Sequence, residues 1–237
     1  MKAWERLINY VTVRTPSDEE SETVPSSVCQ FDLARKLEKE MKELGLTEVV
    51  LDDKCYLYGK LPATEGKKEI PALGFIAHMD TVSDFCDHEI RPMVTENYDG
   101  GDLVLGTSGL VLSPKEFPHL TGLKGRTLLT SDGTTILGAD DKAGIAEILT
   151  MIERIQTEKD ASHILMTHAF LHNLLFYSSV SNSNLCKISL TIPASSIRLI
   201  PKHFLPASFK DAPHDMLSFY QELKNDHEML LCTSHPV

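Results

Sequence analysis

The segment that decides the fold is Leu73-Gly-Phe-Ile-Ala-His78-Met-Asp80-Thr81. Residues 73–77 form an apolar run, which is typical of a strand buried on both faces of a parallel sheet. Polar side chains follow this run at once, and open parallel sheets form their sites outside the carboxyl ends of the strands. We therefore expect an α/β fold, with a mostly parallel sheet flanked by helices and a functional site that begins at His78.

Helical and extended patterns alternate on both sides of this strand. Apolar residues at helical spacing predict three helices, within residues 4–11, 31–44 and 145–155. Short apolar runs predict two strands, at residues 49–51 and 55–58. The triplet Ser131-Asp132-Gly133 predicts a hairpin or another turn. This alternation is what the α/β class requires.

Composition and charge exclude several classes of protein. The 237 residues carry a net charge of −11, from 34 acidic side chains against 23 Lys and Arg, which argues against a nucleic-acid partner. The sequence shows neither a secretory leader nor an apolar run long enough to cross a membrane. Its five cysteines form no CxxC pair, which favours a reducing compartment. We expect a cytoplasmic enzyme without a membrane partner.

The chain changes character near residue 157. All 13 glycines lie between Gly45 and Gly144. Seven of the ten histidines follow residue 157. We therefore treat residues 1–157 and residues 158–237 as two separate parts, the second of them a tail of uncertain fold that is partly disordered.

His78 and Asp80 are the first candidate site residues. They are two positions apart, so they share one face if the strand geometry continues. An imidazole is a good ligand for zinc-like metals, and a nearby carboxylate can accept its other N–H. The alternative is that His78 is an ordinary hydrogen-bonded residue at a strand end.

Asp140 and Asp141 form the second candidate site, between Gly138 and Gly144. Two adjacent carboxylates repel one another, so keeping both ionised in a partly buried site requires a cation or a helix N-terminus. The simpler alternative is that one of them only caps the following helix. The flanking glycines favour a site, because they allow the backbone to approach another group closely.

These motifs resemble those of a known family. Ile76-Ala-His78-Met-Asp80-Thr81-Val82 is similar to the HxDT motif of the M20-type zinc metallopeptidases, and residues 131–147 are similar to their second metal motif. The segments 96–106 and 112–114 resemble more closely the tripeptide aminopeptidases of the peptidase T family. The resemblance covers about residues 1–157 and implies that they are part of a zinc-peptidase catalytic domain.

The resemblance implies a role for each candidate residue. His78 would be a ligand of one zinc, Asp140 would bridge two zincs, and Asp80 would orient His78 as part of the catalytic machinery. Asp141 would follow a non-proline cis peptide bond. The implied reaction is zinc-dependent release of the N-terminal residue from a short peptide substrate, with a Glu as general base.

Other features of the family are not recognisable in the sequence. These are a Glu-Glu pair after the third helix, a later Asp ligand, a dimer-forming lid domain and a late His ligand. The single Glu-Glu pair is Glu19-Glu20, in an early loop. His168 and His172 are four apart and would share a helix face, where we expect ordinary surface residues rather than ligands.

Three readings of function remain open from the sequence. The first is a zinc aminopeptidase, in which this chain holds fewer than the family's two ions, because two protein ligands cannot fill two coordination spheres. The second is a catalytically dead fragment that acts as a binding or interaction module. The third is a magnesium-dependent phosphoryl-transfer enzyme, which His78 and the lack of a GxxxxGK[ST] loop disfavour.

Overall fold

The computed structural model describes residues 1–70, 72–158, 162–163, 166–171, 186–189 and 229–231. The chain divides into two compact units, which we call unit 1 and unit 2. Unit 1 comprises residues 1–91 and 135–192, and unit 2 comprises residues 92–134 and 193–237. Most of the predicted tail lies outside the described residues, so its separate fold stays a prediction.

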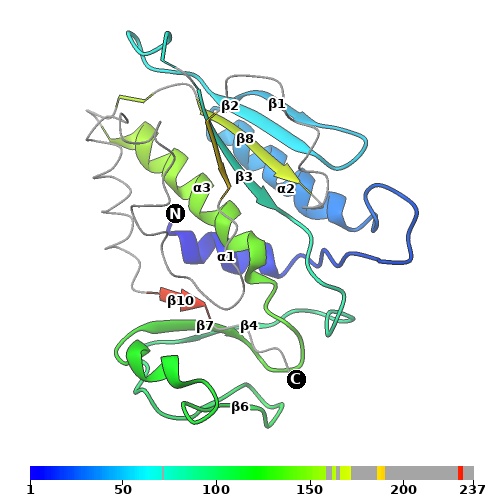
Figure 1. Cartoon of the computed structure of the whole chain (residues 1–237), viewed down its shortest axis with the longest axis vertical. Helices are drawn as coiled ribbons and strands as arrows, with labels where there is room; N and C mark the ends of the chain where they lie inside the picture. The colour runs from blue at the N-terminus through cyan, green and yellow to red at the C-terminus, as the bar shows by residue number, and fades with distance from the viewer. Residues whose placement is uncertain (71, 159–161, 164–165, 172–185, 190–228, 232–237) are drawn as a thin grey trace. The chain divides into compact units, whose positions relative to one another are not determined.

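A five-stranded sheet forms the centre of unit 1 (Figure 1). Its strands, in spatial order, are β1 (Thr47–Leu51), β2 (Leu57–Leu61), β8 (Met166–Leu171), β3 (Leu73–His78) and β9 (Cys186–Ser189). Strand β3 pairs in parallel with β8 and β9, whereas β2 pairs antiparallel with β1 and β8. The α/β class is therefore supported, but the sheet is mixed and its predicted mostly parallel character is not confirmed.

The antiparallel part of the sheet follows from a short turn. Only five residues separate β1 from β2, and a connection this short can join only antiparallel strands. The carboxylate Oδ1 of Asp52 accepts the backbone N–H groups of Lys54 and Tyr56, at 3.0 and 2.8 Å. These bonds stabilise the turn that sets the direction of β2.

Strand β3 is buried more deeply on one face than on the other. Leu73, Phe75 and Ala77 are at most 3% exposed, whereas the alternate residues Gly74, Ile76 and His78 are partly exposed. The expectation of full burial on both faces is therefore wrong. The pattern leaves His78 on the less buried face, at the carboxyl end of the strand.

The three predicted helices are present in unit 1. They are α1 (Ala3–Val11), α2 (Gln30–Glu43) and α3 (Ala139–Thr157). Helix α1 contacts α3, α3 contacts β3, and α2 contacts β1 and β2. Helices α1 and α2 each bury an apolar stripe, as the helical spacing predicts, whereas α3 is buried on almost all sides.

One buried guanidinium joins all three helices. Arg6 of α1 is 2% exposed, and its Nε donates a hydrogen bond to Glu40 Oε1 of α2 at 2.7 Å. Its Nη1 lies 2.9 Å from Glu153 Oε2 and donates to Thr150 Oγ1 at 2.9 Å, both on α3. A buried charge is tolerated when it is paired in this way.

Unit 2 is built on two small sheets. One contains β10 (Met229–Leu231), β7 (Thr127–Ser131) and β4 (Pro92–Thr95), in that order, and the other contains β5 (Leu103–Val104) and β6 (Val111–Leu112). A 3₁₀ helix, η1, covers Pro118–Leu123. The predicted hairpin at Ser131-Asp132-Gly133 does not form, because β7 pairs with β4 and β10.

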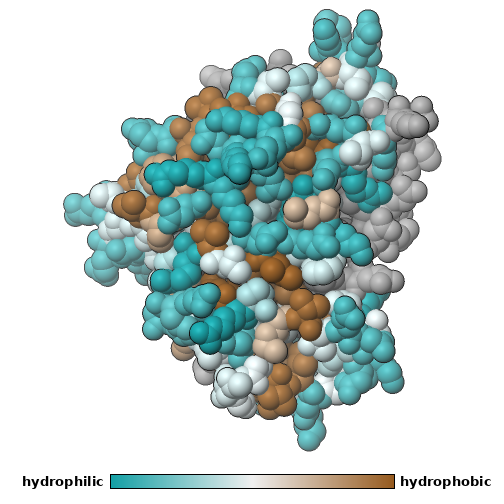
Figure 2. Space-filling view, turned by 180° about the vertical axis from the view of Figure 1, so that it is seen from behind, coloured by the Kyte–Doolittle hydropathy of each residue, from teal (hydrophilic) through white to brown (hydrophobic). Residues whose placement is uncertain are grey.

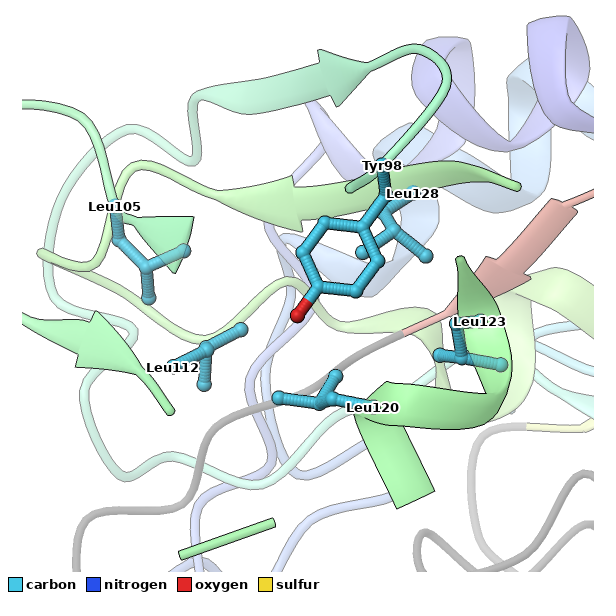
Figure 3. Packing of buried hydrophobic residues seen from close by; sticks show 6 residues of the cluster. All are labelled: Tyr98, Leu105, Leu112, Leu120, Leu123 and Leu128. Carbon is cyan, nitrogen blue, oxygen red and sulfur yellow. The ribbon is translucent and has the colours of Figure 1, made fainter. Parts of the chain in front are cut away.

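A compact apolar cluster holds unit 2 together (Figure 3). The side chains of Leu105, Leu112, Leu120 and Leu123 surround the ring of Tyr98 (Figure 3). The hydroxyl of Tyr98 donates a hydrogen bond to the carbonyl of Gly101, so its polar end is satisfied within the cluster.

The surface mixes hydrophilic and hydrophobic residues, as Figure 2 shows for one face. Among the described residues, the most exposed large hydrophobic side chains include Val28 at 79% and Phe85 at 56%. Single exposed apolar residues are usual in folded proteins. None of the helices within the described ranges has the length and apolar character needed to cross a membrane.

Candidate metal centre

Two segments far apart in sequence meet at the end of β3. The Nε2 atom of His78 lies 3.1 Å from Oδ1 of Asp140. Asp140 and Asp141 have non-helical backbone angles, so the regular part of α3 begins at Lys142. The peptide bond between Asp140 and Asp141 is cis, as the resemblance implies. The structure thus brings together the two residues expected to bind metal.

The other side of the His78 ring faces Asp80. Its Nδ1 lies 2.9 Å from the backbone carbonyl oxygen of Asp80 and 3.3 Å from its carboxylate Oδ1. An N–H at Nδ1 would donate to the backbone carbonyl oxygen of Asp80 and leave a lone pair on Nε2, which is the tautomer that metal ligation needs. This assignment follows from the hydrogen-bond pattern. Asp80 therefore lies where a residue that orients His78 must be.

A loop that precedes α2 holds Asp80 in place. The hydroxyl of Ser17 donates a hydrogen bond to Asp80 Oδ2 at 2.6 Å. The hydroxyl of Thr15 donates to the carbonyl of Met79 at 2.6 Å. Two backbone hydrogen bonds of 2.9 Å join Thr15 and Ser17 to Thr81. Sequence reasoning did not identify Ser17, because nothing in a loop sequence shows which distant residue it contacts.

Asp141 has a different role from Asp140. Its side chain is buried, and its Oδ1 accepts the backbone N–H of Gly144 at 3.2 Å, which caps the first turn of the helix. The side chain of Asp140 is 41% exposed and faces His78. The alternative that one Asp caps the following helix therefore holds for Asp141. Capping does not account for Asp140, whose carboxylate lies beside His78.

Both flanking glycines are required by close contacts. Gly138 has a φ of +71°, and a Cβ there would lie 3.1 Å from Thr81 Cγ2. A Cβ at Gly144 would lie 2.4 Å from Asp141 Oδ1. The contact at Gly138 brings the backbone before Asp140 against Thr81, just after β3, whereas the contact at Gly144 lies within the Asp140 segment itself.

The pKa values of His78 and Asp141 are both shifted at this site. Burial lowers the pKa of His78, but its hydrogen bonds to Asp140 and Asp80 outweigh this and raise the pKa to about 10. Burial raises the pKa of Asp141 to about 8, although the charge of His78 opposes this shift. The carboxylates of Asp80 and Asp140, on two sides of one imidazole, favour a bound cation, which would relieve their mutual repulsion.

The distance between the two donor atoms fits zinc. Two ligands of a tetrahedral zinc, with bonds of about 2.0–2.1 Å, lie about 3.3 Å apart. His78 Nε2 and Asp140 Oδ1 are 3.1 Å apart. The described part of the chain contains no group of three His, Cys, Asp or Glu side chains that could hold a metal ion. It therefore supplies two donors that fit a zinc site, but not a complete coordination sphere.

His168 does not lie on a helix. It lies in β8, where its backbone is opposite Phe75 of β3 and Gly59 of β2. The predicted helical face is therefore wrong at this position, and His172 lies outside the described residues. Glu19 and Glu20, the single Glu-Glu pair of the sequence, are exposed in the loop before α2.

The chain is similar to curated peptidase T sequences. Peptidase T of Caldanaerobacter subterraneus subsp. tengcongensis is 44% identical over 219 residues, which are 90% of this chain and 53% of that protein. Peptidase T of an Exiguobacterium species is 51% identical over 163 residues, 68% of this chain and 39% of that protein. The chain thus spans about two fifths to one half of the length of these relatives. The resemblance to peptidase T is confirmed.

Comparison with family models and solved structures gives two further results. No family model matches the chain. Aminopeptidase PepT from Bacillus cereus ATCC 10987 is 26% identical, with a TM-score of 0.47, over 71% of this chain and 35% of that chain.

Proposed function

We propose that this chain, a homologue of peptidase T, is a zinc-dependent tripeptide aminopeptidase that releases the N-terminal residue from short peptides. The observation that carries this proposal is the 3.1 Å distance between His78 Nε2 and Asp140 Oδ1. The two residues come from the segments that resemble the two metal motifs of the M20-type peptidases. The identity of 44–51% with peptidase T supports the same reaction class.

Each of the three site residues has a role in this proposal. His78 and Asp140 bind zinc, and Asp140 is the residue that would be shared by a second ion. Asp80 keeps an N–H on Nδ1 of His78, so that Nε2 presents its lone pair. Bound zinc would lower the pKa of a water molecule toward about 7 and so provide the nucleophile for amide hydrolysis.

The environment of Asp140 suits a peptide substrate. Its side chain is 41% exposed, whereas His78 and Asp80 are 18% and 16% exposed. The Asp140 side of the His78–Asp140 pair is therefore open to solvent, whereas the side of His78 that faces Asp80 is mostly covered by protein.

The partners and the organisation of the chain follow from the same proposal. We expect a short peptide as substrate and neither a nucleic acid nor a membrane as partner, in a cytoplasmic enzyme. We propose that residues 1–157 contain the catalytic residues named here, whereas the similarity to the Caldanaerobacter relative, over 90% of the chain, extends into residues 158–237.

Zinc content and peptide cleavage test the proposal together. The full chain is purified with added zinc, freed of excess metal and analysed for zinc per chain. It is then assayed with a tripeptide that has a free amino terminus and with its N-acetylated form. At least one zinc per chain, with cleavage of the free tripeptide alone, supports the proposal. Bound zinc without cleavage favours the inactive binding module, and a chain without zinc contradicts the proposed site.

A further inference from the structure

The segment Val13–Ser17 contacts both halves of the candidate metal centre. Lys142, in the first turn of α3, is fully buried, and its Nζ donates a hydrogen bond to the carbonyl of Val13 at 2.7 Å. Four residues later along the segment, Ser17 donates to Asp80 beside β3. One short stretch of chain is therefore bonded to the segment that carries Asp140 and to the segment that carries His78.

The backbone of the segment is fixed as well as its side chains. Thr81 N–H donates to Thr15 O, and Ser17 N–H donates to Thr81 O, each at 2.9 Å, in a short parallel bridge. The Nε2 group of Gln30 donates to Pro16 O at 3.3 Å. Ser17 thus approaches Asp80 from a backbone that is held on both sides, so its hydroxyl has a defined position.

The two oxygens of Asp80 have different partners. Oδ2 accepts the hydroxyl of Ser17 at 2.6 Å, and Oδ1 lies 3.3 Å from Nδ1 of His78. Asp80 Oδ1 is buried and has no hydrogen-bond partner of good geometry in the described part of the chain. Because only Oδ2 is fixed by a hydrogen bond of good geometry, the bond from Ser17 sets how the Asp80 carboxylate is turned toward His78.

From this geometry we infer that Ser17 is a positioning residue, which fixes the carboxylate of Asp80 so that His78 presents Nε2 to the metal. This inference rests on the proposed function. Ser17 touches neither the metal nor the substrate in this account, and it acts only through Asp80. Loss of the direct outer partner of a metal-binding histidine weakens metal affinity by about 10- to 100-fold, and Ser17, which acts one step further out, should give an effect at the lower end of this range.

The test compares zinc affinity among variants of the full chain, by competition with a chromophoric chelator. Ser17→Ala removes the hydroxyl, and we expect zinc affinity to fall by about tenfold. Ser17→Thr keeps the hydroxyl and should restore affinity to within about threefold of the unchanged chain. Ser21→Ala is the matched control, because Ser21 lies in the same loop and its hydroxyl pairs with Thr23 rather than with Asp80.

Two further readouts separate positioning from general stability. The visible spectrum of the cobalt-loaded chain should shift in Ser17→Ala and not in Ser21→Ala, because only the former changes the geometry around His78. The thermal midpoint of the metal-free chain should fall by no more than about 4 °C, which corresponds to the loss of one hydrogen bond. Ser17→Cys, with a weaker donor of similar size, should give an intermediate zinc affinity.

The outcomes distinguish this inference from the proposed function. Equal zinc affinity in the unchanged chain and in Ser17→Ala would overturn the positioning role and leave the zinc site standing. Failure of Ser17→Thr to bind more tightly than Ser17→Ala would also overturn it. If the unchanged chain binds no zinc, both the inference and the proposed function are wrong.

Discussion

The imidazole of His78 and the carboxylate of Asp140 are 62 positions apart in sequence and 3.1 Å apart in space. One lies at the end of β3 and the other precedes the regular turns of α3. Two residues this far apart in sequence come within hydrogen-bond distance only because the fold brings the end of β3 and the start of α3 together.

The first prediction concerns the charge of Asp140. Asp140→Asn keeps the shape of the side chain and removes its negative charge, so we expect zinc affinity to fall by at least about 100-fold. Equilibrium competition with a chelator measures the change. Asp84→Asn, at an exposed position after β3, is the control and should change affinity by less than about twofold. Similar losses in both variants would show that general charge, and not ligation, attracts the metal.

A second prediction concerns the close approach at Gly138. Gly138 and Gly66 have similar positive φ angles, +71° and +80°, but only Gly138 has a neighbour within contact distance, Thr81 Cγ2. Gly66→Ala should cost about 1 kcal/mol of unfolding free energy because of backbone strain alone. We expect Gly138→Ala to cost at least about 1 kcal/mol more, from overpacking.

Urea denaturation of the two glycine variants measures this difference. The comparison isolates the steric contact, since both variants introduce the same residue at a similar backbone angle. Equal losses of stability would mean that Thr81 moves aside at little cost, and that the approach of the two segments is loose.

The third prediction concerns Arg6. Arg6→Met keeps much of the side-chain volume but removes the pairs with Glu40 and Glu153. Because Arg6 is buried, we expect the free energy of unfolding to fall by about 3 kcal/mol. Arg35→Met breaks the exposed pair with Asp32, whose side chains are 64% and 68% exposed, and should change stability by less than about 0.5 kcal/mol. Calorimetry on both variants checks the contrast, and equal effects would contradict a structural role for the buried pair.

A fourth prediction uses the pKa of Cys55. Burial, with the charge of Asp52 adding to it, raises the pKa of this thiol to about 12. At pH 8 its thiolate fraction is therefore about 10⁻⁴, and the thiolate is the reactive form. Cys29 is partly exposed, although burial also raises its pKa. We expect iodoacetamide to modify Cys29 at least about tenfold faster than Cys55 at pH 8.

Peptide mapping by mass spectrometry follows each cysteine separately. Because the pH stays below the pKa of Cys55, its slow rate should rise about tenfold for each unit between pH 8 and 10. In urea, where burial is lost, both cysteines should react at similar rates. Rapid labelling of Cys55 in the folded chain would contradict its burial.

Local patterns in the sequence are sufficient to predict much of unit 1. The run at residues 73–77 predicts β3, and the spacing of apolar residues predicts α1, α2 and α3, because each element buries one continuous apolar surface. The same patterns place His78 at a strand end and Asp140 beside a helix start. His78 and Asp140 come together because sites in α/β folds form at the carboxyl ends of the strands, and the order of helices and strands in the sequence indicates such a fold.

Contacts between distant segments could not be predicted in the same way. Strand β8 lies between β2 and β3, but its short apolar sequence is also compatible with a helix, and length alone does not distinguish the two. Ser17 lies in a polar loop without periodicity, and its bond to Asp80 depends on the tertiary path of that loop.

The position of β8 also has a consequence for synthesis of the chain. Strands β2 and β3 do not pair with each other and are joined through β8, which is translated about 90 residues after β3 ends. At ribosomal rates this delay is about 5 to 20 s. Throughout it the nascent polypeptide carries the unpaired edges of β2 and β3, which are the kind of surface that chaperones shield from aggregation.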